Sequence, residues 1–176
     1  RIVDAIPPYG LIRQFSVEHT KEEKMIYDLI ALSNTGHSIV LDLQPEMGAA
    51  EFEFEYIEQT GGLPDSINVV DVTFFFNAIV RQEIDTNKLD VQRAWENMLA
   101  SKPDFYVTWR SRLSIDLIEK EMMRIDRYNA QTLKQRWAVA TKVKNCESFE
   151  EVPTYYPNLL VYKRRDIVLK QVNDSQ

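Results

Sequence analysis

Three glutamates stand two residues apart in the segment AAEFEFEYIEQTGG, residues 49–62. Side chains two apart share one face of a β-strand, so Glu51, Glu53 and Glu55 would form a row at about 7 Å intervals. That spacing is too wide for two neighbours to bind one metal ion directly. A general acid and base also need unequal environments, which three matched exposed carboxylates do not provide. We therefore interpret the row as the exposed face of a strand and as a docking face for a basic protein partner.

The residues that alternate with these glutamates are aromatic: Phe52, Phe54 and Tyr56. On a strand, the aromatic side chains would lie on the face opposite the carboxylates, as a half-buried antiparallel strand requires. Two glycines then give the chain a turn. We therefore predict that residues 51–57 form a strand whose aromatic face lies in the core.

A divalent-metal enzyme is one class that the acidic residues allow, built around Asp42, Glu51 and Asp71. Such a site needs carboxylates from several segments that wrap one ion. No sequence motif links these three positions. We therefore predict no metal site and no cofactor, and keep this enzyme class as an alternative.

The sequence also lacks the residues that other catalytic motifs require. His19 and His37 are the two histidines, and neither lies in an HExxH motif or beside a nucleophile pattern. The sequence has no glycine-rich phosphate loop, because Gly61-Gly62 has no lysine and helix after it. Cys146 is the only cysteine, which excludes an internal disulfide, and no partner base is visible for it. The sequence therefore predicts a protein that is not an enzyme.

Charge is divided unevenly along the chain, whose net charge is −6. Residues 1–100 hold 7 Lys/Arg against 17 Asp/Glu, whereas residues 101–176 hold 14 against 10. An acidic half and a basic half can dock within one molecule or between molecules. The candidates for partner binding in the basic half are four arginines: Arg110, Arg112, Arg124 and Arg127.

The basic half also has aromatic residues among its cations, a composition typical of nucleic-acid surfaces. Acidic residues are interspersed there, at Asp116, Glu119, Glu121 and Asp126. Mixed signs along a helix indicate a solvated face, and a net charge of −6 disfavours a phosphate-binding surface. A nucleic-acid partner remains possible but is disfavoured.

Length and composition indicate one globular domain over residues 1–176. The chain is 44% hydrophobic and 27% charged, which argues against general disorder. Pro7-Pro8 makes residues 1–15 a candidate extended arm. No apolar run approaches the roughly 18 residues that span a bilayer. We therefore expect an intracellular, cytoplasmic protein with no membrane partner and no disulfide.

The first half of the chain is predicted to alternate helix and strand. Thr20 and Glu23 form a capping box, which starts a helix that ends near Ser33. Residues 66–84 are ambiguous: Val, Ile and Phe favour a strand as far as Phe76 and then a helix, and a single helix is the alternative. The buried face of the first helix should hold Met25, Leu29 and Leu32. The predicted strands of this half are 37–43 and 51–57.

The second half is predicted to be mainly helical. Apolar residues from Leu89 to Leu99 follow a helical period, which indicates an amphipathic helix that ends near Lys102. One long amphipathic helix is predicted over residues 115–143, because apolar residues recur there at helical spacing. At 1.5 Å per residue it would be about 40 Å long. Residues 104–113 are predicted to be either a short strand or the start of that helix. Two short strands end the chain, 158–163 and 166–172.

These elements predict an α+β fold, with a small, largely antiparallel sheet packed against helices. For function, we predict a non-catalytic interaction or assembly component, a structural subunit of a larger complex or particle that binds a protein partner or itself. The divided charge and the long helix support this prediction. The alternatives are an inhibitor or immunity-type protein that covers a basic partner with its acidic stripe, and the divalent-metal enzyme.

Overall fold

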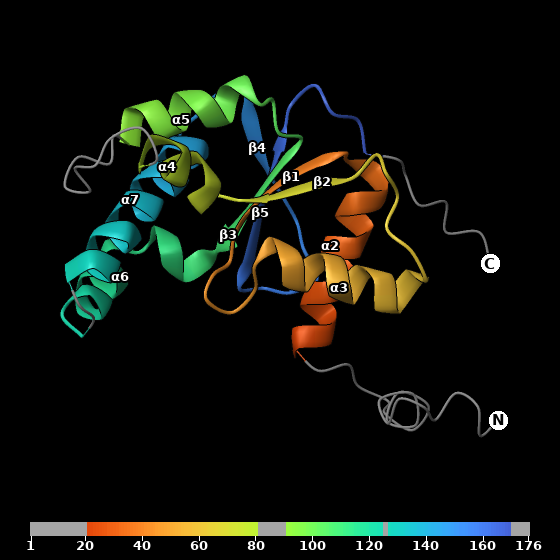
Figure 1. Cartoon of the computed structure of the whole chain (residues 1–176), viewed down its shortest axis with the longest axis horizontal. Coiled ribbons are helices and arrows are strands. Elements are labelled where there is room, and N and C mark those ends of the chain that lie inside the picture. The colour runs from red at the N-terminus through yellow and green to blue at the C-terminus, as the bar shows by residue number, and fades with distance from the viewer. Residues whose placement is uncertain (1–20, 81–90, 125–126, 170–176) are drawn as a thin grey trace.

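The computed structural model of the chain (Figure 1) describes residues 21–80, 91–124 and 127–169. In that part of the chain, five strands form one sheet with helices on both faces, so the α+β class is confirmed. The predicted arm (1–15) and the capping residue Thr20 lie outside the described residues. The elements in chain order are α2 Lys21–Thr35, β1 Ser38–Asp42, α3 Ala49–Thr60, β2 Asn68–Asp71, α4 Thr73–Val80, α5 Val91–Ala100, β3 Phe105–Trp109, the 3₁₀ helix η3 Arg110–Leu113, α6 Ile115–Met122, α7 Arg127–Lys144, β4 Phe149–Val152 and β5 Leu159–Arg164.

The sheet is mixed, with the strand order β2-β1-β3-β5-β4. β1 pairs in parallel with both β2 and β3, whereas β5 pairs antiparallel with β3 and β4. The antiparallel pairing that we predicted accounts for one side of the sheet, and the other side is parallel. The parallel side arises because α3 connects β1 to β2, and α4 and α5 connect β2 to β3, as crossovers between parallel strands require.

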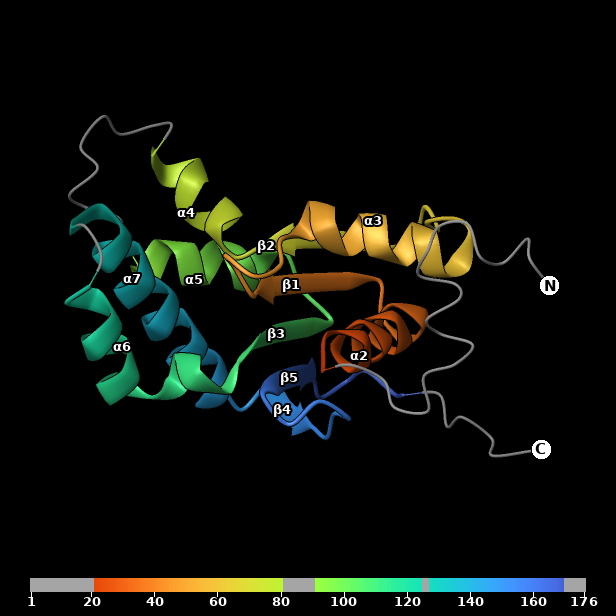
Figure 2. The ribbon, with the colours of Figure 1, turned by 90° about the horizontal axis from the view of Figure 1, so that it is seen from below.

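Each face of the sheet has its own core, because alternate strand residues point to opposite faces. On one face, Ile39, Phe105 and Val161 pack with residues of α2 and α3. On the other face, Val40 and Tyr106 pack with residues of α4, α5 and α7. Figure 2 shows α2 and α3 grouped apart from α4, α5 and α7. The domain is thus a three-layer arrangement with the sheet in the middle.

The first helix and strand agree with the sequence prediction. α2 buries Met25, Leu29 and Leu32, and β1 lies within the predicted strand 37–43. Gly36 follows α2 and lies against the buried ring of Phe105. A Cβ at position 36 would lie 2.0 Å from Phe105 Cε2, so the chain needs glycine where it turns from α2 into β1.

The predicted strand at 51–57 is wrong, because this segment lies in helix α3. Its buried aromatics are Phe52 and Tyr56, which are four residues apart and share one helical face, whereas Phe54 is 61% exposed. Ala and Glu are strong helix formers, and Glu51 Oε2 accepts the Gly48 N–H at 3.1 Å as in a helix cap. Local helix propensity therefore outweighs the alternating pattern, and the glutamates do not form one row.

The single long helix predicted over 115–143 is also wrong. The chain forms two helices instead, α6 and α7, which pack against each other (Figures 1 and 2). α6 ends at Met122, and the Met123 N–H donates to Glu119 O as a helix cap. Apolar residues recur at helical spacing along the buried face of each helix. The same sequence pattern therefore arises from one long helix and from two shorter helices that pack together.

The ambiguous segment 66–84 contains a strand followed by a helix, which is the order that we favoured. The strand β2 is shorter than expected, because α4 begins at Thr73 and already contains Phe76. The end of the segment, residues 81–84, lies outside the described part of the chain.

The remaining predictions have mixed outcomes. α5 lies within the predicted helix that ends near Lys102, and the segment 104–113 contains the strand β3 followed by η3. β4 was not predicted. Of the predicted strand 166–172, the described residues 166–169 are not in a strand. Within the three described ranges, no helix has the length and apolar character needed to cross a membrane.

Candidate functional site

The parallel strands β1, β2 and β3 end at one edge of the sheet. Their last residues are Asp42, Asp71 and Trp109. The chain leaves β1 through α3 on one face of the sheet, and it leaves β3 through η3, α6 and α7, of which α7 covers the other face. In open α/β sheets, ligands bind outside the carboxyl ends of strands at such a change of direction. This edge is therefore where a ligand site is expected.

A buried charge pair lies at this edge. Arg136 of α7 donates a hydrogen bond from Nε to Asp42 Oδ1, and the two side chains are 7% and 0% exposed. Tyr106 and Thr108 of β3 donate their hydroxyls to Asp42 Oδ2 at 2.9 and 3.1 Å. Burial and the Asp42 carboxylate raise the pKa of Tyr106 well above its usual value, so the Tyr106 hydroxyl keeps its proton. Asp42 therefore fixes the position of the Arg136 guanidinium against the sheet.

Two guanidinium groups meet at one backbone carbonyl. Arg136 Nη2 and Arg112 Nη2 donate to Gln44 O at 2.9 and 2.8 Å. The Nε of Arg112, in η3, is buried and has no hydrogen-bond acceptor among the described residues. Burial and the nearby Arg136 guanidinium both lower the pKa of Arg112. Arg112 is thus a partly desolvated cation whose charge is incompletely compensated.

The N-terminus of α3 lies at the same edge and is capped by carboxylates. Glu51 Oε2 accepts the Gly48 N–H and Asp71 Oδ1 accepts the Ala49 N–H, each at 3.1 Å. Burial raises the pKa of Asp71, the hydrogen bond from Ala49 opposes this shift, and the Glu51 carboxylate adds to it. A helix N-terminus attracts anions, and here the protein supplies them itself.

A crevice of about 600 Å³ lies between these groups. Gln44, Gly48 and Glu51 line it from the β1–α3 connection and α3, and Arg112 and Arg136 line it from η3 and α7. A volume of this size accommodates a small ligand. The crevice can offer such a ligand two guanidinium groups and the polar groups of the β1–α3 loop, and the carboxylates of Glu51 and Glu121 also line it.

Two of the predicted partner-binding residues come together in this crevice, Glu51 and Arg112. Arg110, the other predicted residue of η3, does not line the crevice. Arg110 is exposed, donates from Nε to Pro157 O at 3.1 Å, and lies 3.6 Å from a Glu151 carboxylate oxygen.

The other predicted residues are dispersed. Glu53 and Glu55 are partly exposed on α3, and Arg124 is exposed after the end of α6. Arg127 is the first residue of α7, and its side chain lies outside the described part of the structure. The predicted acidic docking row and the predicted arginine cluster are therefore not single surfaces.

Sequence reasoning missed the role of Asp42 and Arg136. Asp42 entered the prediction only as an alternative metal ligand, yet its carboxylate receives Arg136, Tyr106 and Thr108. Among the residues that the structure describes, no group of three or more His, Cys, Asp or Glu is placed to hold a metal ion. An acid at the end of an apolar strand was the available signal, but its arginine partner lies 94 residues away in sequence.

No protein-family model, curated protein or solved structure matches this chain. A functional inference for it therefore depends on the geometry of the crevice.

Proposed function

We propose that the chain binds a small anionic molecule in the crevice at the carboxyl ends of β1, β2 and β3. The observation that carries this proposal is Arg112, whose buried Nε has no acceptor among the described residues. An unmade hydrogen bond on a buried charged group is costly, so a ligand that supplies the acceptor gains that energy on binding. A carboxylate or phosphate also accepts the parallel N–H groups of a guanidinium.

Arg136 supports the same choice of ligand charge. It is held by Asp42 and lies near Arg112, so the two guanidinium groups repel each other. Burial lowers the pKa of Arg112 and this repulsion lowers it further, whereas the carboxylates of Asp42 and Glu46 oppose the shift. An anion that binds beside Arg112 relieves this repulsion. The α3 N-terminus is a poorer place for the anion, because Glu51 and Asp71 already accept the N–H groups there.

Arg112→Ala tests the proposal, with isothermal titration of inorganic phosphate at constant ionic strength as the measurement. We expect the wild-type chain to bind phosphate and the variant to bind it at least about tenfold more weakly, because a charge-assisted hydrogen bond is lost. The fold should tolerate the change, since Gln44 O keeps its hydrogen bond from Arg136.

Arg110→Ala is the matched control, because Arg110 lies in the same 3₁₀ helix and is exposed. Its phosphate affinity should stay within about twofold of wild type, as expected for an exposed charge. Equal weakening by both variants would mean a diffuse electrostatic effect and would contradict a site at Arg112.

A second candidate is the predicted non-catalytic assembly component, with a second copy of the chain as the partner. The specific observation is α3, which carries four glutamates and no Lys or Arg and exposes Phe54 and Ile57 by 61% and 45%. Exposed apolar side chains among charges are typical of a protein contact. The basic half, with Arg110 and Arg124 exposed, is complementary in charge.

Light scattering at low and high salt distinguishes this candidate. Association between the acidic helix and the basic half should weaken from about 0.05 to 0.5 M salt, because the screening length falls about threefold. A monomer at micromolar concentration in both buffers would eliminate self-assembly through these charges.

A further inference from the structure

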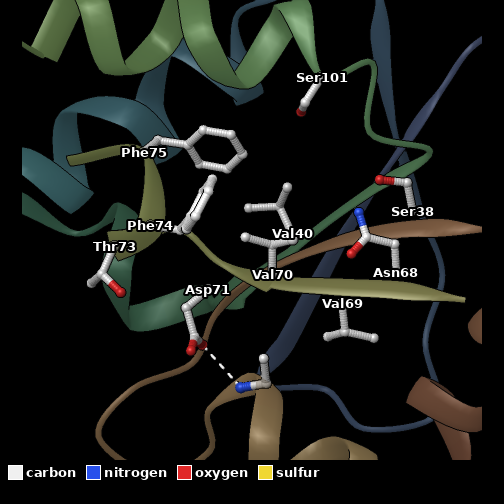
Figure 3. Close-up of a pocket in the computed structure, with 11 residues that line it drawn as sticks. Ser38, Val40, Asn68, Val69, Val70, Asp71, Thr73, Phe74, Phe75 and Ser101 are labelled. Atoms are coloured by element: carbon white, nitrogen blue, oxygen red, sulfur yellow. Dashed lines mark hydrogen bonds between the residues drawn. The ribbon is translucent and has the colours of Figure 1, made fainter. Parts of the chain in front are cut away.

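A second hollow of about 600 Å³ lies beside the anion crevice, along the edge strand β2 (Figure 3). Val40, Val70, Phe74 and Phe75 give it an apolar wall. The rings of Phe74 and Phe75 are 5.6 Å apart and nearly perpendicular, and Phe74 is 59% exposed. The hollow therefore presents an aromatic ring that is accessible to a ligand.

Polar groups stand at both ends of this apolar wall. Figure 3 shows Ser38, Asn68 and Ser101 at one end and Asp71 and Thr73 at the other, with the Asp71 carboxylate turned from the rings toward the Ala49 N–H. An amide and hydroxyl groups can donate to and accept from the edge of a heterocycle. The Asp71 carboxylate accepts the Ala49 N–H and a hydrogen bond from the Gln44 side chain, and a carboxylate has further capacity for hydroxyl donors.

Thr73 lines both the hollow and the anion crevice, so the two spaces are adjacent. A ligand that extends past Thr73 would meet the aromatic wall first, then Asp71, and then Arg112. The matching chemistry in a ligand is a flat aromatic ring, a group with hydroxyls, and an anion, in that order.

We infer that the ligand of the crevice is a mononucleotide, with its base against Phe74, its sugar hydroxyls at Asp71 and its phosphate at Arg112. This inference depends on the anion site proposed above. A dinucleotide fits less well, because the β1–α3 loop contains Gly48 alone and the N–H groups that would hold a pyrophosphate are taken by Glu51 and Asp71.

Titration calorimetry with inorganic phosphate, adenosine and the four ribonucleoside monophosphates tests the inference. The tightest nucleotide should bind at least about tenfold more tightly than phosphate, because stacking of its base adds to the phosphate contact. Phe74→Ala should weaken the binding of that nucleotide roughly tenfold and leave the affinity for phosphate unchanged.

Phe54→Ala is the matched control, because Phe54 is equally exposed, at 61%, but lies on α3 outside the hollow. The affinity of the Phe54→Ala variant for every ligand should match that of the wild-type chain. If no nucleotide binds more tightly than phosphate, or if both phenylalanine variants weaken it equally, the base site is refuted while the anion site stands. If adenosine binds through Phe74 and phosphate does not bind, the anion site is refuted, and with it the phosphate contact at Arg112.

Discussion

Asp42→Asn should lower the free energy of unfolding by about 3–5 kcal/mol, because it leaves the Arg136 guanidinium buried without its counter-ion. Asparagine keeps the size of the side chain and can still accept from Tyr106 or Thr108, so the loss comes mainly from the missing charge. For a domain of this size, the melting temperature should fall by about 10 °C. Urea denaturation followed by circular dichroism measures the free energy of unfolding, and thermal denaturation followed in the same way measures the melting temperature.

The double variant Asp42→Asn/Arg136→Met separates charge from packing. Removing both charges should recover much of the stability, because an apolar side chain in place of a buried ion pair is often neutral. Asp65→Asn is the control at an exposed position and should change stability by less than about 0.5 kcal/mol. A loss below about 1 kcal/mol for Asp42→Asn would show that the pair is not desolvated.

Phe52→Ala should cost about 3–5 kcal/mol, whereas Phe54→Ala should stay within about 0.5 kcal/mol of wild type. Phe52 is 1% exposed and packs between α3 and the sheet, with its ring centroid 6.0 Å from that of Tyr56. Phe54 is 61% exposed. Thermal and urea unfolding of both variants measure the difference.

This pair of variants also discriminates helix from strand. A strand over 51–57 would place Phe52 and Phe54 on the same buried face, so both variants would then lose several kcal/mol. Losses of similar size for the two variants would therefore contradict helix α3.

Periodicity and composition correctly predicted those elements whose formation depends mainly on residues close together in the sequence. The burial of Leu29 in α2 and the strand at Ser38–Asp42 follow from period and composition alone. The segment after Gly48 was misassigned because Phe and Tyr favour strands and alternate there. The i, i+4 pair Phe52 and Tyr56 was the competing signal.

The site could be predicted only in part. Glu51 and Arg112 were identified by charge, which is visible in the sequence. The pairing of Asp42 with Arg136, and the convergence of Arg112 and Arg136 on Gln44 O, depend on contacts between segments 68 to 94 residues apart. Periodicity and caps contain no information on which distant elements pack together.

NMR titration of the ¹⁵N-labelled chain with inorganic phosphate tests the central claim most directly, through the Nε–H signals of the arginines. The Arg112 signal, assigned by its loss in Arg112→Lys, should shift as phosphate is added and reach saturation, because its Nε gains an acceptor. The Arg110 signal should stay in place, since that Nε already donates to Pro157 O. An Arg112 signal that does not move at saturating phosphate, or small shifts spread evenly over all arginines, would contradict an anion site at the carboxyl ends of the parallel strands.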